Sequence, residues 1–201
     1  MQERNAITSV PINDLAGRRW SPRAFDATQG VTAAQQVALI EAARWSPSCF
    51  GAEPWRFLYW NRAEDASGWQ QAFDCLSENN RKWCKNVPLL FMACAGAVFE
   101  QNGQPNRWAQ YDTGMAALSL TLEAVAQGLV AHQMGGFDIA KSRTAFAIPD
   151  DFMPMAMIAV GYQAAPETLA DEETRQKELK ARGRKPVDER FYGGSWGRPA
   201  G

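Results

Sequence analysis

The chain has 201 residues and a mass of 22.3 kDa, which predicts one domain covering residues 1–201. Its 21 Lys and Arg residues nearly balance its 22 Asp and Glu residues, giving a formal net charge of −1. This balance argues against a general nucleic-acid-binding protein, which needs a net basic surface. It also removes bulk attraction to anionic membranes.

Targeting and metal-binding signals are weak. The first residues show no apolar segment behind a basic start, so we expect no secretory signal. The apolar run 87–99 has 13 residues, and the longest run without a charge, 152–166, has 15, whereas a membrane-spanning helix needs about 20. We therefore expect a cytoplasmic protein without membrane contacts. Four cysteines at irregular spacings and one histidine argue against a zinc site and favour reduced, mostly structural thiols.

The first half of the chain alternates predicted helices and strands. Thr32 has the hydroxyl of a helix N-cap, and the helix that it begins should end before Pro47. The aromatic run 57–60 predicts a short strand, 64–77 a second helix, and the continuous apolar run 89–95 a strand buried on both faces.

The second half contains the longest predicted helix. Residues 101–107 are polar and should form a loop, whereas 108–127 repeat apolar residues at helical spacing. Gly128 is a plausible residue to end that helix. Asp138 predicts the N-cap of a shorter helix that runs through Phe146.

Few strands are interspersed among these helices. The apolar segment 154–162 predicts a third buried strand, and the charged tail from Glu167 onward either solvates one surface or wraps around a partner. The pattern favours an α+β domain, with a small sheet flanked by helices, over a doubly wound parallel sheet. Neither GxGxxG nor GxxxxGK[ST] occurs, so the two commonest phosphate-binding loops are absent from the sequence.

Two basic clusters stand out in this neutral chain. The segment Arg18-Arg19-Trp20-Ser21-Pro22-Arg23 places three guanidinium groups and a hydroxyl within six residues. A second cluster occupies 181–186. Guanidinium groups match phosphate oxygens bidentately, although a basic hexapeptide is also typical of a solvated turn. The sequence leaves open whether the clusters converge on one anion.

A third motif, 46–57, joins a helix end to a strand. It reads Ser-Pro-Ser-Cys-Phe-Gly-Ala-Glu-Pro-Trp-Arg-Phe, with small residues and two prolines. Its backbone amides can face a flat ligand, although the segment alone is also consistent with a rigid turn. Arg-Arg-x-Ser-x-Arg followed by this motif resembles the FMN-dependent nitroreductase family. The resemblance continues in order through 80–83, 87–90, 111–114, 128–138, 158–162 and 182–186.

The resemblance implies a nitroreductase-like α+β homodimer with a mostly antiparallel central sheet, FMN at the subunit interface, and a C-terminal tail that wraps the partner subunit. It assigns the phosphate and ribityl chain to Arg19, Trp20, Ser21 and Arg23, with Arg182 and Arg184 closing from the tail. It assigns the isoalloxazine ring to Pro47, Ser48 and Cys49 of the opposite subunit. Asn80 or its neighbour Asn79, with Lys82, would contact the pyrimidine edge, and Gln133, Met134, Gly135 and Gly136 would pass near N5.

The resemblance also implies a reaction. NADH or NADPH would pass hydride to the flavin, and a flat, electron-poor small molecule, a nitroaromatic or a quinone, would then take its place in a ping-pong sequence. No catalytic side chain is required, because the chemistry belongs to the cofactor. His132 is better interpreted as a loop or packing residue than as a general base, and Cys49 lacks the signature of a nucleophile. The alternatives are a non-catalytic flavin-binding or redox-sensing protein and an interaction domain without cofactor.

Overall fold

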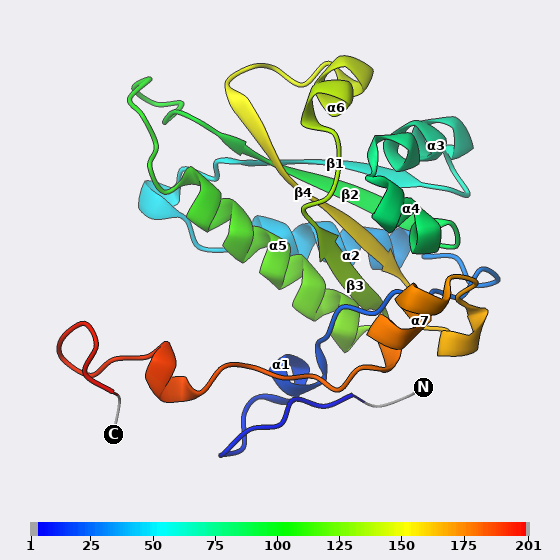
Figure 1. Ribbon diagram of the computed structural model, residues 1–201. Coiled ribbons are helices and arrows are strands. Elements are labelled where there is room, and N and C mark those ends of the chain that lie inside the picture. Colours follow the sequence, from blue (N-terminus) through cyan, green and yellow to red (C-terminus); the bar gives the residue numbers. More distant parts are fainter. Residues whose placement is uncertain (1–3, 200–201) are drawn as a thin grey trace.

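The computed structural model describes residues 4–199 (Figure 1). Its strands are β1 (Trp55–Asn61), β2 (Leu89–Gly96), β3 (Val130–Met134) and β4 (Phe152–Gly161). Its α-helices are α1 (Asp14–Arg18), α2 (Ala33–Arg44), α3 (Ala66–Cys75), α4 (Glu78–Cys84), α5 (Ala109–Ala126), α6 (Ile139–Phe146) and α7 (Glu172–Leu179). Single 3₁₀ turns occupy Cys49–Gly51, Pro166–Thr168 and Val187–Glu189.

The strands form one antiparallel sheet in the order β1-β2-β4-β3. All eight residues of β2 are buried, as its uninterrupted apolar sequence predicts. Because successive side chains point to opposite faces, β2 supplies both cores: Leu89 and Phe91 join one, Leu90 and Met92 the other. The predicted α+β class with a small antiparallel sheet is confirmed.

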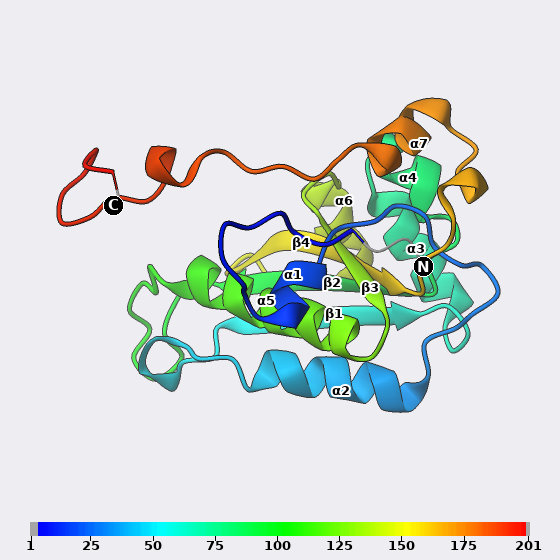
Figure 2. The ribbon, with the colours of Figure 1, turned by 90° about the horizontal axis from the view of Figure 1, so that it is seen from below.

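Helices cover both faces of the sheet. On one face lie α2 and α5, whose small residues Ala116, Ala117 and Ala124 let α5 pack closely against strands and α2. On the other face lie α3, α4 and α6, with Trp69 and Trp83 in the core (Figure 2). Each sheet face is therefore shielded. Segments 4–31 and 163–199 add no strand to the sheet, but Ala24, Phe25 and Leu169 pack into one core and Val31 into the other.

Helix ends follow the predicted signals. Thr32 and Gln35 form a reciprocal capping box at the start of α2, and Asp138 accepts the backbone N–H of Lys141 at 2.9 Å. Gly128 adopts φ +74° directly after α5. The N–H groups of Gly128 and Leu129 bond the carbonyls of Val125 and Ala124, which is the hydrogen-bonding pattern of a Schellman motif.

Two sequence predictions are wrong. The described residues contain four strands rather than three, since 130–134 forms β3 at the edge of the sheet. The predicted helix 64–77 is shorter and ends at Cys75, because the backbone at Leu76 and Ser77 is extended before α4 begins. Predictions for 33–46, 57–60, 108–127 and 154–162 are confirmed within a few residues.

The tail has two parts that behave differently. Residues 166–184, including α7, return to the body, where α7 lies near α4 (Figures 1 and 2). Residues 187–199 extend away from it, with Phe191 and Trp196 exposed. Wrapping of a partner subunit by this segment stays a prediction. Within residues 4–199, no helix combines the length and apolar character needed to cross a membrane.

Candidate functional site

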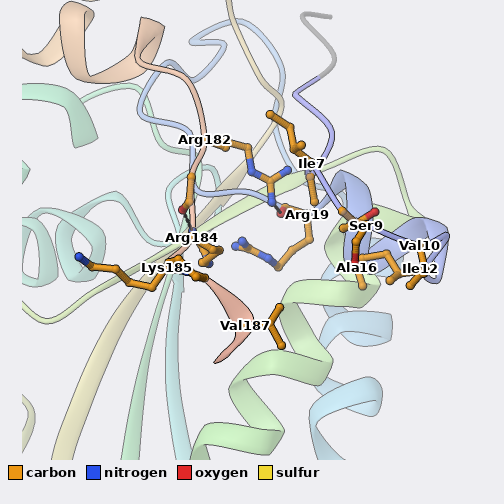
Figure 3. A pocket seen from close by; sticks show the side chains of 14 residues that line it. Ile7, Ser9, Val10, Ile12, Ala16, Arg19, Arg182, Arg184, Lys185 and Val187 are labelled. Atoms are coloured by element: carbon orange, nitrogen blue, oxygen red, sulfur yellow. Dashed lines mark hydrogen bonds between the residues drawn. The ribbon is translucent and has the colours of Figure 1, made fainter. Parts of the chain in front are cut away.

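A cavity of about 750 Å³ lies between the N-terminal segment 6–19 and the tail segment 182–187 (Figure 3). Arg19 and Arg184 face one another across it, whereas Lys185 extends away from both. The opposite wall is apolar and includes Ile7 and Val10. The fold thus brings together the two basic clusters that the sequence places more than 160 positions apart.

Arg182 has a different role from its neighbour Arg184. Its guanidinium donates to the backbone carbonyls of Arg4, Gly17 and Arg19, the last two at 2.9 Å. These bonds fasten the tail to the segment that precedes Arg19. Arg182 therefore lines the cavity, but its guanidinium N–H groups bond backbone carbonyls of the protein itself.

The cavity is electropositive. Partial burial lowers the pKa of Arg19, and the charges of Arg182 and Arg184 lower it further. Among residues 4–199, no carboxylate forms an ion pair with any of these three arginines, whereas the adjacent Arg18 pairs with Asp14 at 2.6 Å. Like charges gathered without a counter-charge are the arrangement expected where an anion binds.

The segment after Arg19, residues 20–25, is held from beneath by buried polar groups; we call it the arm. The backbone N–H groups of Arg23 and Ala24 donate to the Glu178 carboxylate, at 2.8 and 3.3 Å. Glu178 is 1% exposed, and its burial raises its pKa. Nothing in the charged sequence of α7 distinguishes this buried carboxylate, and our sequence analysis missed it.

Other side chains of the arm are ordered locally. Arg19 donates to the Ser21 hydroxyl at 3.3 Å, so both lie at the same side of the turn. The Trp20 ring lies under the guanidinium of Arg4, 5.0 Å from its centroid. Arg23 lines a second, small polar cavity of about 100 Å³, together with Asn79, Asn80, Lys82 and α7 residues.

The predicted pyrimidine-edge residues surround that second cavity. Asn80 donates its amide to the Gly136 carbonyl at 2.9 Å, whereas Asn79 is exposed and makes no side-chain hydrogen bond within the described chain. Lys82 lies 3.6 Å from Asp171, at the start of α7. Asn80 is therefore committed to the fold, which leaves Asn79 as the freer amide of the two.

Segment 133–136 leaves the end of β3 close to α4. Gln133 donates to the Ala117 carbonyl at 3.2 Å and to the Thr121 hydroxyl at 3.1 Å, so its side chain points to α5. Met134 is buried in the core. A Cβ at Gly136 would lie 2.8 Å from the Ser77 hydroxyl, whereas one at Gly135 would meet open space. A ligand approaching this segment would contact its backbone.

The loop with Pro47, Ser48 and Cys49 lies elsewhere, at the start of α5. The Cys49 N–H donates to buried Asp112 at 3.0 Å, and Ser48 accepts the N–H of Glu53 at 3.0 Å. Figures 1 and 2 place this loop at the opposite end of α5 from the arm and α7. One chain thus does not bring the loop together with Arg19 and Arg184.

The remaining thiols are structural in position. Cys75, Cys84 and Cys94 are buried, and burial raises the pKa of Cys94 to about 11. His132 on β3 is partly buried and packs against Trp83, which agrees with the expectation of a packing residue.

Comparison with known proteins identifies the fold. The model of the nitroreductase family matches residues 16–162. The chain belongs to the nitroreductase family. Membership places it among flavin-dependent oxidoreductases and confirms the resemblance read from its ordered motifs.

Individual relatives agree with this assignment. The chain is 28% identical to a crystal structure described as an oxidoreductase containing FMN, with a TM-score of 0.89 and 98% of each chain covered. It is 36% identical over 131 residues to an uncharacterized 15.4 kDa protein of Mycolicibacterium smegmatis, covering 62% of this chain and 82% of that protein. It is 28% identical over 180 residues to Protein DrgA of Synechocystis, covering 74% and 82%. A nitroreductase family protein of Streptococcus pneumoniae shares the fold, with a TM-score of 0.71, 19% identity, and 90% and 98% covered.

Proposed function

We propose that this nitroreductase family member binds FMN and uses it to reduce flat, electron-poor small molecules, nitroaromatics or quinones, with NADH or NADPH as donor. The observation that carries the proposal is the convergence of Arg19 and Arg184 on one cavity from opposite ends of the sequence. A phosphate monoester carries close to two negative charges and offers several acceptor oxygens. Two guanidinium groups without carboxylate partners in residues 4–199 match that group in charge and in hydrogen-bonding geometry.

The donor set fits FMN beyond its phosphate. Arg19, Ser21 and Arg184 would hold the phosphate, and Arg182 would keep their backbone in place. Arg23 and Asn79 would extend the polar contacts along the ligand. The backbone at Gly135, with open space where a Cβ would stand, leaves room for a flat ring.

When bound, FMN supplies a ring that accepts hydride from a nicotinamide and gives it to the acceptor. The chain therefore needs no acid or base of its own. Lys82 would place a positive charge near the pyrimidine edge, where it favours negative charge on the ligand. Its present partner Asp171 lies 3.6 Å away, and both side chains are about one third exposed, so this ion pair is weak enough to rearrange.

A second copy of the chain completes the proposed site. The Pro47–Cys49 loop and the arginine cavity lie at opposite ends of α5, so both contact one flavin only if they come from different subunits. The α5 surface exposes Tyr111 and Leu118, and the tail beyond 187 exposes Phe191 and Trp196. These apolar side chains are suited to an isologous homodimer contact, with the tail reaching the partner.

Donor and acceptor would use one cleft in succession, since the sequence has no separate dinucleotide-binding fingerprint. Initial rates measured at several fixed NADH or NADPH concentrations should then give parallel double-reciprocal lines. Intersecting lines would indicate a ternary complex and would refute the shared cleft.

The decisive experiment is an anaerobic titration. The purified protein should be yellow, and NADH or NADPH should bleach it in proportion to bound FMN, with colour returning on addition of a quinone or nitroaromatic. A yellow protein that neither donor bleaches would be a flavin-binding or redox-sensing protein instead. A colourless protein that takes up no added FMN would refute the proposal altogether.

A further inference from the structure

His132, the chain's single histidine, is partly buried and hydrogen-bonds the arm. Its Nδ1 lies 2.8 Å from the carbonyl oxygen of Pro22. A carbonyl only accepts hydrogen bonds, so this contact requires the proton to be on Nδ1. Pro22 is itself buried, and no other donor to its carbonyl occurs among the described hydrogen bonds. The imidazole therefore satisfies a carbonyl at the centre of the Ser21–Arg23 turn.

The imidazole also packs on Trp83. The two ring centroids are 4.7 Å apart at an interplanar angle of 30°, and Trp83 also stacks with Phe25, with centroids 5.9 Å apart at 15°. Phe25 belongs to the arm, Trp83 to α4 and His132 to β3. One aromatic stack thus joins three elements that are far apart in the sequence.

These are the three elements that carry most of the proposed FMN contacts. The arm carries Ser21 and Arg23 and follows Arg19, α4 carries Lys82, and β3 leads directly into Gly135. A separate hydrogen bond from Asn80 to the Gly136 carbonyl joins α4 to the end of β3. The Glu178 carboxylate and the backbone hydrogen bonds that flank Phe25, from Ala164 to Ala24 and from Asp26 to Tyr162, hold the later part of the arm. The hydrogen bond that joins the arm to β3 is the one between His132 and Pro22, so His132 acts on the Ser21–Arg23 turn in particular.

The electrostatic surroundings demand a neutral donor at this position. Burial is the main cause that lowers the pKa of His132 to about 4, and the positive charges of Arg23 and Arg19 lower it further. At neutral pH the ring therefore offers one N–H to Pro22 without repelling the two guanidinium groups. A lysine or arginine would supply the donor but would add a third buried positive charge.

We propose that His132 is a positioning residue for FMN binding: its Nδ1–H, supported by Trp83, fixes the Ser21–Arg23 turn so that Arg19 and Ser21 reach the FMN phosphate while Arg23 reaches further along the ligand. The inference rests on the proposed function for the identity of the ligand. The effect of His132 on the order of the arm, however, is expected in the protein without FMN as well.

Two substitutions separate the hydrogen bond from the stack. His132→Phe keeps an aromatic ring against Trp83 and removes the donor, whereas His132→Asn keeps a donor close to the Nδ1 position and removes the ring. Losing the donor should weaken FMN binding about 3- to 10-fold, the range expected for one net hydrogen bond. His132→Asn should stay within about twofold of wild type in FMN affinity, although it loses more core packing.

Stability should rank the variants in the opposite order. The thermal midpoint should fall further for His132→Asn, which loses the stack, than for His132→Phe. If His132 only supports the fold, FMN affinity and thermal midpoint would fall in the same order. Opposite rankings are therefore the signature of positioning.

Backbone amide exchange in the FMN-free full-length chain provides a readout that needs no ligand. The amides of Arg23 and Ala24 should exchange about 3- to 10-fold faster in His132→Phe than in wild type or His132→Asn. Unchanged exchange together with unchanged FMN affinity in His132→Phe would overturn the inference. Wild-type protein that binds no FMN would instead refute the proposed function, while the exchange comparison would still decide the role of His132.

Discussion

The polar groups at the two ends of α5 are organised differently. At one end, Arg19 and Arg184 face a cavity whose backbone is braced by Arg182 and Glu178, all from the same chain. At the other end, the 46–54 loop has three residues at positive φ within four positions: +54° at Phe50, +64° at Gly51 and +44° at Glu53. The first end encloses a space of about 750 Å³.

The difference indicates which part of the proposed site is complete in one subunit. The arginine end has walls, charge and bracing hydrogen bonds of its own. The loop end is held by one buried carboxylate, Asp112, and leaves Phe50 84% exposed. A non-glycine residue at positive φ costs about 1 kcal/mol or more. An exposed aromatic side chain maintained at that cost is typical of a surface that meets something outside its own chain.

The largest expected effect concerns the coupling of FMN binding to dimer formation. If FMN bridges the arginine end of one subunit and the loop of another, its binding must stabilise the dimer. At about 100 times the dissociation constant, FMN adds roughly 2.7 kcal/mol per site, or about 5 kcal/mol for two sites. The midpoint of dimer dissociation should then shift by roughly three to four orders of magnitude in concentration.

Mass photometry or sedimentation of FMN-free and FMN-saturated protein over a dilution series measures this shift. A monomer that retains FMN on dilution would show that the arginine end suffices. The loop would then have no part in binding the cofactor.

The next effect tests the arginine end alone. Replacing Arg19 or Arg184 with alanine removes a charge-assisted bidentate contact, which costs about 1.5–3 kcal/mol, or roughly 10- to 150-fold in FMN affinity. Arg18→Ala is the matched control, because Arg18 is adjacent, exposed and paired with Asp14. Quenching of FMN fluorescence gives each dissociation constant. If Arg19→Ala, Arg184→Ala and Arg18→Ala all bind FMN equally well, the phosphate binds elsewhere.

A smaller, pH-dependent effect tests the bracing of the arm. The pKa of His132 is about 4 in the fold against about 6.5 in an unfolded chain, so between these values the unfolded state binds more protons. The free energy of unfolding should therefore fall as pH falls from 6.5 to 4, by up to about 1.4 kcal/mol per unit from this residue.

Urea denaturation of wild type and His132→Asn at several pH values isolates that contribution. The stability advantage of wild type should shrink as the pH is lowered through this window and stay constant above it. An advantage that does not change with pH would mean that His132 is not held neutral by its surroundings.

The sequence predicts elements whose signals are local. The apolar repeat of 109–126 and the glycine that follows it indicate one long helix, and the ordered motifs indicate the family and the arginines. The sequence does not predict β3, because its short run includes His132 and Gln133. Those side chains are satisfied by Pro22 and by α5, partners distant in the sequence.

The bracing residues escape sequence analysis for a related reason. Glu178 lies in a helix of charged residues that looks fully solvated, yet its carboxylate is buried because two backbone N–H groups from 23 and 24 meet it. Arg182 belongs to a basic run that suggests a phosphate contact, yet it bonds three carbonyls. Burial and partner are tertiary properties, and residue type alone does not encode them.

The smallest expected change in stability tests the loop end, through Phe50. Because its side chain is exposed and alanine has the same Cβ at φ +54°, Phe50→Ala should alter the free energy of unfolding by less than about 0.5 kcal/mol. If the ring stacks on a flat acceptor, KM for a quinone should rise about 3- to 10-fold, as expected for losing one aromatic contact. Phe50→Leu keeps apolar bulk without the ring, so its KM for the quinone should lie between those of wild type and Phe50→Ala. Unchanged KM in both variants, with FMN affinity intact, would assign the exposed ring to the subunit interface instead.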